Sequence, residues 1–228
     1  MEFLGMYLDE HLMLRWVHII AMAYWLGGEW GVFNASRLLT NANLSLAERK
    51  RHMETAYRID ILPRTGIVLL LPLGLHLGYN MGYQPLGGNW LVGMWIFTAA
   101  WVALVITAFF KRKSPFYMVL TKTDEAIRYV VIPALFAVGV YSLVTGGPLS
   151  AGWYAAKAVI FSGLLIIGLL LRYIMRDWIT IFNQLEAIGG SAELEAKLAS
   201  ALAFGRKLAY FYWAGIMTNA FLGAVKPF

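Results

Sequence analysis

Residues 90–110 read WLVGMWIFTAAWVALVITAFF, with no charged side chain among them. A helix rises about 1.5 Å per residue, so this run covers about 30 Å of bilayer hydrocarbon. Backbone groups in lipid must be hydrogen-bonded within the segment, and no alternating strand pattern occurs along the chain. The run therefore predicts a transmembrane helix.

The rest of the chain repeats this pattern. It has 228 residues, 60% hydrophobic and 14% charged, against about 25% charged in soluble domains. We predict an all-α, polytopic membrane protein: one domain, residues 1–228, folded as a six-transmembrane-helix bundle. The six predicted spans cover residues 12–33, 64–83, 90–110, 129–146, 151–175 and 207–225.

The basic residues orient this bundle. Sixteen of the 19 Lys and Arg fall in three stretches, residues 37–64, 111–128 and 172–207. All three lie on one side of the six-span topology, and the positive-inside rule makes that side cytoplasmic. Both termini are then outside, as expected for a bacterial inner-membrane protein. The net charge of +6 thus reflects orientation against membrane lipid, and we expect no nucleic-acid partner.

Two cytoplasmic helices are predicted between spans, at residues 45–61 and 177–206. The first opens with Ser45 followed three residues later by Glu48, the pattern of a capping box. The first span follows acidic residues and lacks a basic n-region, so we expect a retained helix and not a signal peptide. Cysteine is absent, which excludes disulfides, iron–sulfur clusters, thiolate haem ligation and catalytic thiols.

Two histidines lie within predicted spans. His18 is six residues into the first span, about 9 Å deep, and His76 is seven residues before the end of the second, about 10 Å deep. Ionisable side chains are costly in a bilayer and usually face a cavity, a partner or a cofactor. Two neutral imidazoles facing each other across antiparallel helices are what a six-coordinate haem iron requires. We predict that His18 and His76 ligate haem b.

Two cations accompany the histidines. Arg15 lies one turn outward of His18, where a guanidinium pairs well with a haem propionate. Lys157 is six residues into the fifth span and shares the depth of the histidines. It either extends to the interface, pairs with a carboxylate of the cofactor or a substrate, or ligates iron.

Three other ionisable residues are weighed differently. His11 at the outer interface and His52 in a basic run are expected to be solvated. Glu29 lies about 16 Å below His18 along the first span. It either relays protons from the cytoplasm or neutralises a charge on a neighbouring helix.

Short motifs of this chain resemble a superfamily of small membrane proteins. The strings WVHII at 16–20, WLGG at 25–28 and Arg37-Leu38 are similar to its first helix. The superfamily includes the copper-resistance D proteins, the membrane part of cytochrome-linked urate oxidases and the HemJ-type protoporphyrinogen oxidases. WYAAK at 153–157, RHME at 51–54 and Pro63 also resemble elements of the HemJ-type pattern.

The resemblance implies haem b in a helical bundle, with His18 as an axial ligand and a functional Lys157. Two features of this chain depart from the HemJ-type pattern. Those proteins are usually four-helix, whereas this chain inserts its third and fourth spans, and His76 has no counterpart that we can assign. These departures favour electron transfer over porphyrinogen oxidation.

Four functions remain open from the sequence. The first is a haem b membrane cytochrome subunit that transfers electrons between a periplasmic redox partner and quinone or a larger respiratory complex. The second is protoporphyrinogen oxidation, with Lys157 or Arg15 binding substrate carboxylates. The third is copper handling, for which M-x-x-M clusters and His-rich outer loops are lacking. The fourth is a structural accessory subunit whose histidines are satisfied inside the bundle.

Overall fold

The computed structural model describes residues 2–3, 6–7 and 9–228, and it confirms the predicted all-helical fold. A ribbon of two-residue strands, β1 (Glu2–Phe3) and β2 (Met6–Tyr7), precedes the helices. The helices are α1 (Glu10–Ser36), α2 (Leu46–Ile59), α3 (Ile61–Asn80), α4 (Asn89–Phe110), α5 (Tyr117–Thr145), α6 (Gly152–Ile188) and α7 (Ala192–Val225), with a 3-10 turn, η1 (Arg37–Thr40), after α1.

Five of the described helical segments are long and apolar enough to cross a membrane. They are the continuous α2–α3 stretch (Leu46–Asn80), α4, α5, α6 and α7. The first of the six predicted spans, residues 12–33, lies in α1, which is not among these five helical segments. Arg15, His18 and Glu29 lower the mean hydropathy of α1, although its 27 residues are enough to span a bilayer.

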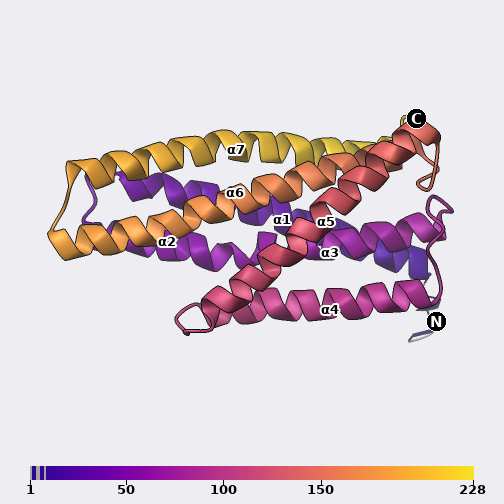
Figure 1. Cartoon of the computed structure of the whole chain (residues 1–228), viewed down its shortest axis with the longest axis horizontal. Helices are drawn as coiled ribbons and strands as arrows, with labels where there is room; N and C mark the ends of the chain where they lie inside the picture. The colour runs from indigo at the N-terminus through magenta and orange to yellow at the C-terminus, as the bar shows by residue number, and fades with distance from the viewer. Residues whose placement is uncertain (1, 4–5, 8) are drawn as a thin grey trace.

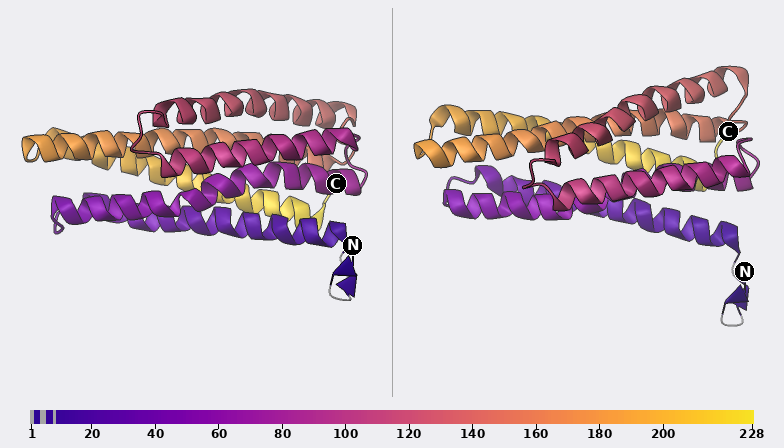
Figure 2. Two further views of the ribbon diagram at one scale, coloured as in Figure 1. Left: turned by 90° about the horizontal axis from the view of Figure 1, so that it is seen from below. Right: turned by 60° about the horizontal axis from the view of Figure 1, so that its bottom comes forward.

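The helices form an elongated bundle. α1 packs along α3, and α6 packs against α7 and α5. α5 crosses the bundle obliquely and α4 lies at its edge (Figure 1). Both chain ends lie at the same end of the bundle, together with the α3–α4 and α5–α6 loops (Figure 2).

Small residues join α1 to α3. A Cβ on Gly28 would collide with Cδ of Pro63, and a Cβ on Gly66 would lie 2.9 Å from the carbonyl oxygen of Ala21. Glycine at such points lets two helices approach closely, as is common in membrane bundles. Pro63 itself lies in the first turn of α3, where its missing N–H leaves no bond unmade. The seam fixes α1, and with it His18, against α3.

At the other end of the bundle, α6 and α7 continue past the α4–α5 loop and pack with α2 and the end of α1 (Figure 1). The capping box of α2 is present: Ser45 Oγ accepts from the Glu48 N–H at 3.3 Å, and Glu48 accepts from the Ser45 N–H at 2.8 Å. The turn between α6 and α7 uses Gly189 at φ 73°, in the left-handed region that favours glycine. Predicted helices 45–61 and 177–206 thus correspond to α2 and to the α6–α7 hairpin.

Candidate functional site

A cavity of about 490 Å³ lies among α1, α3, α6 and α7, toward the end of the bundle that holds the termini. We call it the histidine cavity. Its walls are mainly apolar, with Leu135 and Val138 of α5 closing one side. The polar residues of its lining include His11, Arg15, His18, Tyr154, Lys157, Asn219 and Lys226.

His18 is the central polar group of this lining. Its Nδ1 atom is buried and has no hydrogen-bond partner among the described residues. Gly74 of α3 stands opposite the ring, where a Cβ would lie 3.6 Å from His18 Cε1. A buried nitrogen without a partner costs about 1–3 kcal/mol.

Cationic side chains line the same cavity. Lys157 Nζ lies 6.0 Å from the centroid of the Trp153 ring, and Lys226 Nζ lies 5.6 Å from it. The indole ring thus holds both ammonium groups by cation–π attraction. Arg15 adds a guanidinium from α1. Together these three cations make one part of an otherwise apolar cavity strongly positive.

Glycines on α7 and α3 allow the WYAAK segment of α6 to take this position. A Cβ on Gly223 would lie 2.6 Å from Lys157 Nζ, so the lysine passes over a residue without a side chain. Tyr154 donates its hydroxyl to the carbonyl oxygen of Gly74 at 3.1 Å. A Cβ on Gly78 would collide with that hydroxyl. The segment therefore connects α6 to α3, beside His18, and to α7.

His76 lies outside the histidine cavity, and the expected pairing with His18 is not formed. Trp95 Nε1 donates to His76 Nδ1 at 3.2 Å, and His76 Nε2 lies 3.0 Å from Glu10 Oε1. Since Nδ1 accepts a hydrogen bond, the proton of the neutral ring is on Nε2 and is donated to Glu10. Neither ring nitrogen is then available to a metal ion.

The physical reason is helical phase. Successive residues are 100° apart around a helix, so His76 lies about 200° around α3 from Gly74, which faces the cavity. His76 is directed toward α4 instead. The estimate of depth along the helix axis contained no information about this angle.

The other candidate residues divide between the two ends of the molecule. His11, expected to be solvated, lines the histidine cavity, two turns of α1 from His18. Glu29 lines a separate, smaller cavity among arginines. His52 lies on α2, which packs against the far ends of α1 and α6.

One functional candidate, Lys226, was missed in the sequence. It is the C-cap residue of α7, a position that is usually occupied by solvated residues. The sequence does contain a signal for Lys226, which is its position along the helix axis. Because α6 and α7 are antiparallel, the end of α7 lies at the same height as the start of α6, and Lys226 lies beside Trp153, one turn from Lys157.

The site suits a largely apolar ligand that carries anionic groups and an atom that an imidazole binds. It does not suit a chelated metal ion, since the described residues contain no group of three or more His, Cys, Asp or Glu able to hold one. In comparisons with known proteins, no family model, no curated protein and no solved structure matches this chain.

Proposed function

We propose that the histidine cavity binds haem b, with His18 as an axial ligand. The observation that carries this proposal is the position of His18 in the lining of a large, mainly apolar cavity that also holds three cations, Arg15, Lys157 and Lys226. Haem is an apolar macrocycle with two carboxylates on one edge, and its iron binds imidazole. A volume of about 490 Å³ lies within the usual range of about 300–1,000 Å³ for small-molecule sites.

The carboxylates of haem would pair with Lys157 and Lys226, held at Trp153, and with Arg15. Charge-assisted hydrogen bonds of this kind are stronger than neutral ones. The proposal places α1 as a sixth membrane span, with both termini outside a bacterial inner membrane. The protein then serves as a cytochrome subunit that passes electrons between a periplasmic redox partner and quinone or a larger respiratory complex.

A second candidate function is oxidation of a porphyrinogen. The placement of Lys157 over Gly223, with its ammonium at the cavity, favours binding of a substrate carboxylate. A porphyrinogen has the same outline and the same carboxylates as haem, and its electrons would pass to membrane quinone. The resemblance of WYAAK to the HemJ-type element also supports this candidate.

A visible spectrum of the purified protein tests haem binding. We expect b-type reduced-minus-oxidised bands that are lost in His18→Ala and retained in His76→Ala. The second variant is the matched control, because His76 is another membrane histidine, bound to Trp95 and Glu10. Absence of haem bands in the wild-type protein purified under mild conditions contradicts the proposal. Loss of the bands in both variants would instead support the earlier expectation that both His18 and His76 ligate the iron.

Complementation separates the two candidate functions. Expression in a bacterial strain that lacks porphyrinogen oxidase should restore growth without added haem if the protein acts on porphyrinogen, and Lys157→Met should abolish this rescue. A haem-loaded wild-type protein that fails to rescue supports the cytochrome function and excludes the enzyme.

A further inference from the structure

A second polar site lies deep in the bundle, toward the end opposite the termini. Four helices contribute one arginine each to a cavity of about 60 Å³, which we call the arginine cavity. The arginines are Arg64 of α3, Arg128 of α5, Arg172 of α6 and Arg206 of α7. Glu29, Asp60 and Tyr212 also line it, and Asp124 adjoins it.

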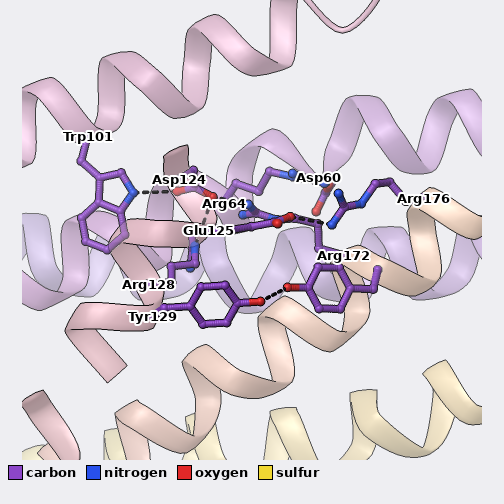
Figure 3. Close-up of polar contacts among 10 residues, drawn as sticks. Asp60, Arg64, Trp101, Asp124, Glu125, Arg128, Tyr129, Arg172 and Arg176 are labelled. Atoms are coloured by element: carbon purple, nitrogen blue, oxygen red, sulfur yellow. Dashed lines mark hydrogen bonds and ion pairs between the residues drawn. The ribbon is translucent and has the colours of Figure 1, made fainter. Parts of the chain in front are cut away.

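Two of the carboxylates are held by specific partners (Figure 3). Asp124, whose side chain is 1% exposed, accepts hydrogen bonds from Trp101 Nε1 at 2.6 Å and Arg128 Nε at 3.2 Å, and a third from Arg172 Nη1. Asp60 accepts from Arg64 one turn later in the chain. The contacts of Asp124 join α4, α5 and α6, and the Asp60–Arg64 pair lies at the junction of α2 and α3, but they leave part of the donor capacity of the cluster unused.

The unused donors belong to two of the arginines. Arg128 Nη2 and Arg206 Nε are buried and have no hydrogen-bond partner within residues 9–228. The Arg128 side chain is 2% exposed, so water outside the bundle does not solvate it. A guanidinium stays protonated in proteins and has no acceptor of its own. Its buried N–H groups therefore require an acceptor inside the cavity.

The charges of the described residues lead to the same requirement. Four guanidiniums face three carboxyl groups, those of Glu29, Asp60 and Asp124, so at least one positive charge is in excess. Arg176 nearby pairs with Glu125 (Figure 3) and does not change this balance. An uncompensated charge in a buried site costs several kcal/mol. An additional negative charge in the cavity would reduce this excess and accept hydrogen bonds from the arginines.

We propose that the arginine cavity binds a small monovalent anion of the size of chloride. A cavity needs about 10–15 Å³ to hold one water molecule, so a volume of about 60 Å³ accommodates such an ion. The anion contacts Arg128 and Arg206, and it connects α7 to the α3–α5–α6 cluster. This site is separate from the histidine cavity and does not depend on the function proposed for it.

Chloride dependence of unfolding tests the site. The full chain in detergent is heated in sodium chloride and sodium gluconate mixtures of constant ionic strength. The apparent midpoint should rise by roughly 3–6 °C for each tenfold increase in chloride above its dissociation constant, because ligand binds the folded state. Wild-type protein that unfolds at the same temperature in every mixture overturns the proposal.

Matched arginine variants assign the effect to the cavity. Arg206→Gln removes one donor and the excess charge and breaks no ion pair, so its midpoint should no longer respond to chloride. Arg37→Gln, on η1 and outside the cavity, should respond as the wild type does. An equal response in all three proteins places the ion elsewhere and contradicts the proposal.

Crystals grown in sodium bromide provide a direct measurement. Anomalous scattering should show a bromide peak within hydrogen-bond distance of Arg128 Nη2, even if the arginine variants fail to fold. Ordered water alone at that position overturns the proposal.

Discussion

The contrast between His18 and His76 shows which property of a membrane residue a sequence reveals. Depth follows from counting residues at 1.5 Å each, whereas direction depends on the rotation of a helix about its axis. In a span that is apolar all round, such as α3, the sequence pattern does not define that rotation. In the folded chain His18 lines a cavity, whereas His76 is directed toward Trp95 of α4.

Gly74 provides a first test at this scale. Gly74→Leu should place a branched side chain against the His18 ring and reduce the haem content to below about a tenth, while the helical circular dichroism stays unchanged. The control is Gly93→Leu on α4, where no described heavy atom lies within 4 Å of the added Cβ. Haem measured as pyridine haemochrome per mole of protein reports the difference. Equal haem content in both variants would contradict the role of the cavity.

Gly223 provides a second test. Gly223→Ala should displace the Lys157 ammonium, since the new Cβ would lie 2.6 Å from Nζ. We expect haem binding to weaken roughly tenfold through loss of a charge-assisted bond, with little change in stability because a lysine end moves easily. Titration of haem-free protein with haemin measures this change. Gly163→Ala on the same bundle is the control, because it meets no described atom within 4 Å.

At the scale of elements, apolar runs located the helices but not all of their ends. The predicted fourth span began at residue 129, whereas α5 begins at Tyr117. The difference arises because Asp124, Glu125 and Arg128 lower the hydropathy of the first turns and suggest a loop. In the folded chain all three are buried, and Asp124 and Glu125 pair with arginines of α6. Such long-range pairs are not visible in a local pattern.

The α1–α3 seam gives a prediction at this scale. Gly28→Ala should lower the free energy of unfolding by about 1–3 kcal/mol, because the added methyl meets backbone and ring atoms of Pro63 that cannot yield. Gly27→Ala, one residue earlier, meets no described atom within 4 Å and should leave stability unchanged or raise it by up to about 1 kcal/mol. Thermal unfolding of both variants in detergent makes the comparison. A milder effect at Gly28 than at Gly27 would rule out the close approach.

For the whole molecule, α1, α3 and α6 line the histidine cavity, whereas α2 with the RHME string lies at the other end of the bundle. The arginine cavity was not predicted from the sequence, because its residues are far apart in the chain and were assigned individually to cytoplasmic loops. The positions of the basic residues in the sequence indicated only the orientation of the chain in the membrane. That four of these arginines line one cavity becomes visible only when their four helices are assembled.

The absence of cysteine makes the topology directly measurable. Single cysteines in place of Leu86 in the α3–α4 loop and Leu12 on α1 should react with a membrane-impermeant maleimide in intact spheroplasts. Cysteines in place of Lys113 and Asn43 should react only after permeabilisation. The reverse pattern would invert the orientation, and labelling of both Leu12 and Asn43 variants from the same side would exclude α1 as a span.

The length of α6 mechanically connects the two ends of the bundle. Its 37 residues form a rod of about 55 Å, without an internal proline, that runs from Trp153 and Lys157 to the turn at Gly189. The far third of this rod belongs to the projecting α2–α6–α7 end of the bundle (Figure 2). A force that tilts this projection would therefore also move Lys157, because both belong to one uninterrupted helix.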